Sequence, residues 1–318
     1  MEKTNTKSTL TGGGSSAFSD WSQRIPYKTR EKILAIALLL PAFIVMMLVT
    51  GYPLVYSIRL SFFEKILTQP KDVAPFVGLQ NYINVIRDPL YLESWLLTFR
   101  YVFVSTAISF LIGFTLALLL NRPLKGRGFI TSLFLIPWLV PSVVTATLSR
   151  LLFSPQFGGI NLALFQLGII NKMYDWYTSP SLALPAILAV NIWRSFPYMM
   201  VMLLAGLKTI SHELYEAADL DGAGWFGKLR YITLPCIRSI IAIVTLVSII
   251  WNFQQFSTIY IPTKGGPSTA TTTLAINLYK TAFYGFDHGK AAAMGTLWLL
   301  FLLGFSALYL RIFSEREQ

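Results

Sequence analysis

Residues 216–235 read EAADLDGAGWFGKLRYITLP, a mostly polar stretch between two long apolar segments. The pattern predicts a helix, a break and a second helix. Ser211 can cap a first helix that ends at Leu220, and Gly222 then supplies the break, because glycine readily adopts the left-handed conformation that ends helices. We expect Pro235 to open the next membrane helix, since proline is favoured at the first helical position.

The first of these two helices is short and slim. Ala217 and Ala218 keep its side chains small, which lets a second backbone approach closely. A short amphipathic helix outside the bilayer is suited to insertion into a groove on a partner protein. An ordinary amphipathic loop lying on lipid headgroups is the alternative, and it would also explain the polarity and the aromatic residues.

The composition is that of a polytopic membrane protein. Of the 318 residues, 54% are hydrophobic and only 13% are charged, whereas a soluble domain has about 25% charged residues. Apolar segments long enough to cross a bilayer as helices are expected at residues 33–62, 95–120, 129–153, 182–207, 235–261 and 291–310. The expected fold is therefore all-α, with six transmembrane helices.

Prolines interrupt two of the expected spans. The first contains Pro41 and Pro53, either of which can kink a helix. The third contains IPWLVPS at residues 136–142, whose two prolines break the backbone hydrogen bonds at membrane depth. Such a break is tolerated where protein or a water-filled cavity surrounds it.

The net charge of +11 is explained by topology rather than by binding to nucleic acid. Fourteen of the 26 Lys and Arg residues fall on one side of the expected spans, seven on the other, and five in or at the ends of spans. The richer side should be cytoplasmic. This predicts a cytoplasmic N-terminal tail at residues 1–32, a membrane domain at 33–310 with a cytoplasmic loop at 208–234, and a cytoplasmic C-terminal tail at 311–318.

The sequence offers no catalytic or metal-binding constellation. Cys236 is the single cysteine, and His212 and His288 lie far apart in the sequence. A Gly-rich phosphate loop that ends in Gly-Lys-Ser/Thr is also absent, so no motif provides an ATPase site. We therefore expect no cofactor, no metal ion and no enzymatic activity in this chain.

At the polar stretch the chain resembles the membrane permeases of ABC importers that receive solute from an extracellular binding protein. The signature of that family is Glu-Ala-Ala, three residues, Gly, nine residues, then Ile-x-Leu-Pro. Seven residues match it in register, which the headgroup alternative does not explain: Glu216, Ala217, Ala218, Gly222, Ile232, Leu234 and Pro235. The resemblance implies a loop that docks into a cleft on a cytoplasmic ATPase and transmits its closure, through Glu216, Ala217, Ala218, Asp221, Gly222 and Ala223.

The resemblance also implies the partners and the location. A second permease subunit would complete the pathway, and two cytoplasmic ATPase subunits would bind ATP and Mg²⁺. An extracellular solute-binding protein would deliver the solute. The chain itself would be a pore-forming subunit, surrounded by lipid in the plasma (inner) membrane, with both termini in the cytoplasm.

Three polar clusters lie within the third, fourth and fifth expected spans. Their amides, hydroxyls and aromatic faces suit a neutral sugar. Over residues 113–309 the chain most resembles the larger membrane subunit of maltose-type transporters, and FVGLQNY at residues 76–82 adds a weaker match. The resemblance implies a pocket formed by Trp138, Ser142, Asn191, Arg194, Ser195, Ser248, Asn252 and Gln255. The alternative is that these polar residues hold helices together.

Arg194 lies near the middle of the fourth expected span. A charge there is costly in hydrocarbon, so we expect it to face a polar cavity or a partner. Its counter-charge would come from the second permease or from an anionic solute, unless water and carbonyl groups suffice.

The expected function is import of a carbohydrate. The alternatives are import of a phosphorylated polyol such as glycerol phosphate, secondary transport, and a scaffold or channel subunit. Secondary transport is disfavoured because the expected spans contain no Asp or Glu to carry a coupling proton. A scaffold or channel leaves the signature at residues 216–235 unexplained.

Overall fold

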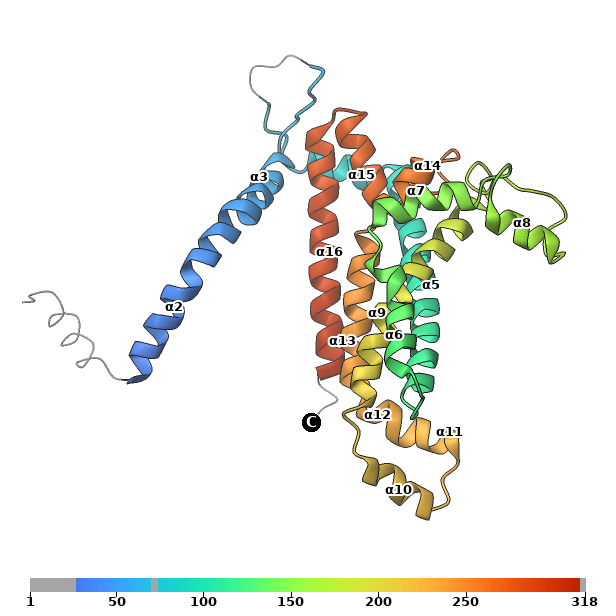
Figure 1. The fold of residues 1–318 in the computed structure, drawn as a ribbon. Coiled ribbons are helices and arrows are strands. Elements are labelled where there is room, and N and C mark those ends of the chain that lie inside the picture. Colours follow the sequence, from blue (N-terminus) through green and yellow to red (C-terminus); the bar gives the residue numbers. More distant parts are fainter. Residues whose placement is uncertain (1–26, 70–73, 315–318) are drawn as a thin grey trace, which may run out of the picture. The chain divides into compact units, whose positions relative to one another are not determined.

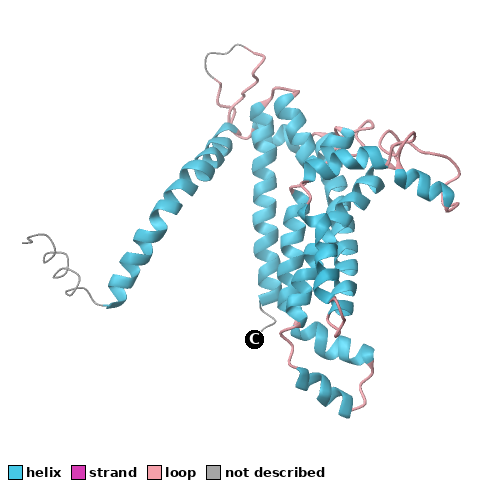
Figure 2. Cartoon of the chain, viewed as in Figure 1, coloured by secondary structure: helices cyan, strands magenta, loops and turns pink. Residues whose placement is uncertain are grey.

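The computed structural model describes residues 27–69 and 74–314 (Figure 1). These residues form helices joined by loops and two isolated β-bridges, as expected of an all-α protein (Figure 2). The expected tails lie largely outside the described residues, although the first helix already begins at Tyr27. The chain divides into two compact units, residues 1–59 and 60–318, which we describe separately.

The first unit is a long apolar helix with one wide turn. It consists of α2 (Tyr27–Met46), a π-helical turn η1 (Met47–Gly51) and α3 (Tyr52–Leu60). The wide turn directly precedes Pro53, whose ring would otherwise clash with the carbonyl group one turn earlier. None of the most apolar part of this helix is buried, which suits a surface surrounded by lipid.

The second unit is built on four long helices. They are α5 (Pro89–Leu120), α9 (Ala183–Leu207), α13 (Arg238–Phe253) and α16 (His288–Ser314). Helix α9 packs along α5, and α13 contacts α5, α9 and α16 (Figure 1). Gly113 permits the close approach of α5 and α9, because a Cβ atom there would lie only 2.6 Å from the Cβ of Met199. Small residues commonly allow such packing between membrane helices.

The expected third span is sharply bent. Helices α6 (Arg127–Leu139) and α7 (Ser142–Leu152) meet at 90°, so the break expected at the two prolines of residues 136–142 is confirmed. Val140 precedes Pro141 and is extended, with ψ 126°, because the proline ring excludes the helical conformation from the residue before it. Residues 27–69 and 74–314 therefore contain five helices long and apolar enough to cross a membrane, or up to six if the bent pair is counted as one span.

The helix, break and helix expected around residues 211–235 are confirmed. They are α10 (His212–Leu220), α11 (Trp225–Lys228), a π-helical turn η2 (Leu229–Thr233) and α12 (Leu234–Cys236), and Figure 1 shows α10 and α11 beyond one end of the bundle. Gly222 takes a φ of +75° at the break. Ser211 occupies the N-cap position, but its side chain makes no capping bond.

The expected role of Pro235 is wrong. This proline opens only the short α12, and the long helix α13 begins after Ile237. The fifth expected span is also interrupted at its other end, where α13 stops at Phe253 and α14 (Ser257–Thr263) begins a few residues later.

Short helices cover the end of the bundle opposite to α10. They are α4 (Gln80–Ile86), α8 (Gly159–Gln166), α14 and α15 (Leu274–Phe283). The segment between α14 and α15 is an internally bonded turn, in which the hydroxyl of Thr272 donates to the carbonyl of Gly265 at 2.7 Å. Asn161 organises the neighbouring loop: it is fully buried, and its amide donates to the carbonyl of Tyr174 at 2.7 Å.

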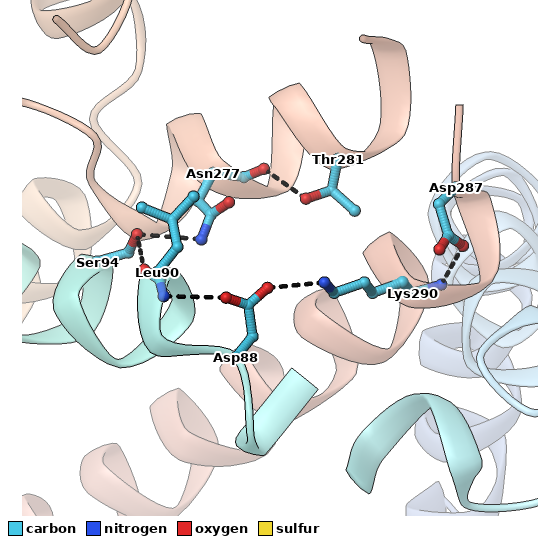
Figure 3. Close-up of polar contacts among 7 residues, drawn as sticks. All are labelled: Asp88, Leu90, Ser94, Asn277, Thr281, Asp287 and Lys290. Carbon is cyan, nitrogen blue, oxygen red and sulfur yellow. Dashed lines mark hydrogen bonds and ion pairs between the residues drawn. The ribbon is translucent and has the colours of Figure 1, made fainter. Parts of the chain in front are cut away.

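A polar cluster ties α5, α15 and α16 together at this end (Figure 3). Asp88 caps α5 by accepting a hydrogen bond from the backbone N–H of Leu90 at 2.9 Å, and it pairs with Lys290 of α16 at 2.7 Å. Asn277 of α15 donates to Ser94 of α5 at 3.1 Å. Burial alone would raise the pKa of Asp88, but the hydrogen bond and charge of Lys290 outweigh it, so the pKa lies below its ordinary value of 3.8.

The low pKa of Asp88 predicts a pH-dependent contribution to stability. A carboxyl whose pKa is depressed in the folded state stabilises that state above its ordinary pKa, and this contribution is lost as the pH falls through the folded pKa. Asp88→Asn keeps the cap but removes the ion pair, so it should lower the stability of the purified chain by about 1 kcal/mol at neutral pH. Thermal unfolding in detergent should show this deficit shrinking below about pH 4.

Asp175→Asn is the matched control, because Asp175 is exposed in a loop. It should unfold like the wild type at every pH. A deficit of Asp88→Asn that did not change with pH would contradict a role for the ion pair.

Candidate functional site

A polar and aromatic cavity lies between α6, α9 and α13. It has a volume of about 80 Å³. Six of the residues expected in the pocket line it: Trp138, Arg194, Ser195, Ser248, Asn252 and Gln255. Helix α6 supplies the tryptophan, α9 and α13 supply the next four, and Gln255 lies in the turn after α13.

Two aromatic residues that were not expected from the sequence, Tyr198 and Trp251, also line this cavity. The Tyr198 ring lies 4.7 Å from that of Trp251 and 6.0 Å from that of Trp138, measured between ring centroids. The three rings form a continuous aromatic wall. Helical spacing was the available signal, since Tyr198 follows Arg194 by four residues and Trp251 follows Ser248 by three.

Arg194 is half-buried and lines the cavity, but its charge has no acidic neighbour there. None of the described residues that line the cavity is Asp or Glu. The buried Nε atom of Arg194 also lacks a hydrogen-bond partner within the part of the chain that the structure describes. Because Nε itself is closed to solvent, hydrogen bonds to a group that enters the cavity would come from the terminal N–H groups of the guanidinium.

Asn191 holds helices together and does not line the cavity. It is fully buried, and its amide donates to Ser105 of α5 at 2.5 Å and to the side-chain oxygen of Asn252 of α13 at 2.8 Å. Asn252 in turn donates to Thr106 of α5 at 3.0 Å. This network joins α5, α9 and α13, so Asn252 belongs both to the network and to the wall of the cavity.

Ser142 and Gln255 are displaced from their expected positions by breaks in the helices. Ser142 begins α7 beyond the bend and is not among the lining residues. Gln255 was expected within the fifth span at residues 235–261, but α13 ends before it. There it accepts a hydrogen bond from Thr258 at 3.2 Å, and it still lines the cavity.

The residues expected to contact an ATPase lie together at the α10 end. Glu216, Ala217 and Ala218 belong to α10, and Asp221, Gly222 and Ala223 form the turn after it. Glu216 is exposed and lies 2.9 Å from His212. Large apolar side chains beside these residues are exposed to solvent: Leu220 is 91% exposed, Trp225 63% and Phe226 68%.

The expected spans contain no carboxylate, but the helices of the structure extend beyond the expected bounds. For the observed helices the expectation is therefore wrong. The second span begins at Pro89 and so includes Glu93, and the first candidate span begins at Glu31. Glu93 is exposed and lies in the first turns of α5, at the end of the bundle opposite to α10. Neither residue lines the cavity at Arg194.

Residues 109–316 match the family described as "Binding-protein-dependent transport system inner membrane component". The chain belongs to this family. It is the permease subunit of a binding-protein-dependent ABC importer, a multi-pass protein of the inner membrane, and is not itself an ATPase.

Relatives and a solved structure agree with this assignment. The trehalose/maltose transport system permease protein MalF of Thermococcus litoralis is 33% identical over 285 residues, which are 90% of this chain and 95% of the relative. The sulfoquinovosyl glycerol transport system permease protein SmoG of Agrobacterium fabrum is 33% identical over 287 residues, 90% of this chain and 92% of the relative. A chain in the crystal structure of a bacterial alginate ABC transporter in complex with alginate pentasaccharide-bound periplasmic protein shares the fold with a TM-score of 0.75 at 23% identity, over 90% of this chain and 95% of that one.

The position of Asn191 in this permease predicts a role in stability. Asn191→Leu keeps the volume of the side chain but leaves the polar groups of Ser105 and Asn252 without their shared partner. An unsatisfied buried polar group costs about 1 to 3 kcal/mol. We therefore expect thermal unfolding of the purified variant in detergent at a clearly lower temperature.

Gln255→Ala is the control for Asn191→Leu, because Gln255 is partly exposed and lies outside the network. Its unfolding temperature should stay close to that of the wild type. Unchanged stability of Asn191→Leu together with lost uptake would instead place Asn191 among the solute contacts.

Proposed function

We propose that the solute of this permease is a carbohydrate and that it passes through the cavity at Arg194. The observation that carries the proposal is the aromatic wall beside hydroxyl and amide side chains. Aromatic faces pack against the C–H surfaces of a sugar, and Ser195, Asn252 and Gln255 offer donors and acceptors for its hydroxyl groups. The names of the relatives, which refer to trehalose, maltose and sulfoquinovosyl glycerol, support the same class.

The size of the cavity supports a second permease subunit. Its volume of about 80 Å³ is well below the range of about 300 to 1,000 Å³ typical of pockets that enclose a small molecule. This chain therefore provides one wall of the pathway, and a related subunit provides the other. A carboxylate of that subunit would also give Arg194 its counter-charge.

The α10 end is the proposed docking site for the ATPases. Its exposed apolar residues suit a groove on a partner, and the small side chain of the exposed Ala217 allows close approach. Ala218 is buried against the chain itself, so it is not part of this surface. Two cytoplasmic ATPase subunits, which bind ATP and Mg²⁺, would dock there, so the α10 end would lie in the cytoplasm. We propose the same side for both termini, as the distribution of Lys and Arg predicts. The extracellular binding protein would then deliver solute at the opposite end, and alternating access would move it inward.

Import of a phosphorylated polyol is the second candidate. The observation that favours it is the guanidinium group of Arg194, in a cavity with no acidic side chain among its described lining residues. A phosphate oxygen would accept hydrogen bonds from this guanidinium group.

Reconstitution distinguishes these functions. The chain, its cognate second permease and the ATPases are placed in liposomes with the binding protein, and uptake of trehalose, diacetylchitobiose and glycerol phosphate is measured with and without ATP. Carbohydrate uptake that needs both ATP and the binding protein supports the proposal. Uptake of glycerol phosphate alone supports the second candidate, and uptake driven by a proton gradient without ATP refutes the coupling to an ATPase.

Arg194 is predicted to be essential for transport but not for assembly. Arg194→Leu removes the charge from the cavity, so it should assemble with the partner subunits and show at least about tenfold lower uptake, equivalent to about 1.4 kcal/mol. Arg194→Lys should keep more activity if charge rather than the planar shape of the group is needed. Both are measured as ATP-driven uptake in liposomes.

Arg87→Leu serves as the control, because Arg87 is exposed outside the cavity. Its uptake should match that of the wild type. Full transport by Arg194→Leu would remove this residue from the pathway.

A further inference from the structure

The backbone between α10 and the next helix is a weak mechanical link. It runs through Asp221 to Gly224, a turn in which Gly222 has a left-handed conformation. No side chain packs within 4 Å of the positions where Gly222 and Gly224 would carry a Cβ atom. A displacement of α10 could therefore bend this turn without moving the helix that follows.

Two side-chain contacts bridge the turn. Asp219 of α10 pairs with Lys228 of α11, but its side chain is 62% exposed, and exposed ion pairs are weak. Tyr215 of α10 bonds to Thr233 at the end of η2, with 2.9 Å between the hydroxyl oxygens, and Thr233 is only 4% exposed. The second contact is therefore the stronger constraint on the angle between α10 and the next helix.

The donors in this second contact can be assigned from chemistry. The hydroxyl of Thr233 donates its single proton to the backbone carbonyl of Lys228 at 3.2 Å. It therefore accepts the hydrogen bond from Tyr215, whose hydroxyl is the donor. The chain of bonds connects α10 to the backbone on both sides of the wide turn η2.

Beyond Thr233 the chain enters the core of the bundle. Ile237 is fully buried and packs in one apolar cluster with Leu203 and Leu207 of α9. Gly206 of α9 lies so close to Ile240 of α13 that a Cβ atom there would be 2.7 Å from its side chain. A movement that reaches Thr233 is thus passed to α9 and α13, the helices that carry most of the cavity wall.

We propose that Tyr215 and Thr233 are positioning residues that fix α10 to α13, so that a displacement of α10 moves the cavity wall. This rests on the proposed function, in which α10 docks onto an ATPase. Without the bond, ATP hydrolysis continues, but the turn at Gly222 absorbs much of the movement. The bond therefore determines how much solute is moved for each ATP hydrolysed.

The test compares Tyr215→Phe and Thr233→Val in the complete complex, reconstituted in liposomes with the binding protein and the solute that the wild type transports. Both variants keep the shape of the side chain and remove the bond. We expect normal assembly, continued ATP hydrolysis and at least threefold less solute moved per ATP. The double variant should be no worse than either single variant, and Thr233→Ser should restore most of the ratio.

Two controls separate this effect from general changes in the loop. Tyr231→Phe alters a tyrosine that is 77% exposed, and Asp219→Asn removes the exposed ion pair. Both should keep the wild-type ratio of transport to hydrolysis.

Three results would overturn the proposal: an unchanged ratio in both variants, additive losses in the double variant, or a loss of ATPase association in Tyr215→Phe. The last would place Tyr215 in the docking surface itself. Failure of the proposed function would be distinguishable from failure of this inference, because the wild-type chain itself would then bind no ATPase.

Discussion

The arrangement of the second unit depends on one constraint: polar groups buried between membrane helices must bond to one another. The amide N–H groups of Asn191 meet this constraint for three helices at once, through Ser105 of α5 and Asn252 of α13, while its side-chain oxygen has no partner among the described residues. Each of these groups would lose its partner if a helix rotated, since neither lipid nor water is available at this depth to replace it. The network therefore fixes the faces that α9 and α13 turn toward the cavity.

Apolar packing alone would leave those faces less well defined. Met199, Met200 and Leu203 of α9 fill the space against α5 and α13, but apolar contacts are not directional. The absence of a side chain at Gly113 sets how closely α5 and α9 approach, while the amide network sets their rotation. Arg194 and Ser195, the fourth and fifth residues of the NIWRS run that starts at Asn191, consequently line the cavity while Asn191 itself faces α5.

Local sequence patterns predicted the helices well, because the formation of a helix depends largely on residues that are close together in the sequence. The apolar runs gave the long helices, and Gly222 gave the break after α10. The bend at Pro141 was less predictable: a proline can kink a membrane helix or stop it, and the difference depends on what α7 packs against, which is α14. Ser142 was misplaced for this reason.

The composition of the cavity was predictable only in part. The side chains of Asn191 and Ser195 are both polar and one turn apart on the same helix, so no local pattern separates the one that bonds to α5 from the one that lines the cavity. Tyr198 and Trp251 were missed for a different reason. Aromatic residues are common on surfaces that face lipid, and their place beside Trp138 depends on the angle at which three helices meet.

The geometry of α13 shows why the cavity and the α10 end belong to one mechanical system. This helix runs without interruption for 16 residues, about 24 Å, and it begins directly after Ile237, which is anchored in the core. An unbroken helix transmits a shift along its length. Ser248 and Asn252 therefore move when the end of α13 next to Ile237 moves. The interruption after Phe253 leaves α14 outside this segment, and Gln255 lies in the turn between them, where its backbone N–H donates to the carbonyl of Asn252 at 3.3 Å. Asn252 and Gln255, the two amides that line the cavity, are therefore both tied to the end of α13, and a movement of this helix reaches both of them.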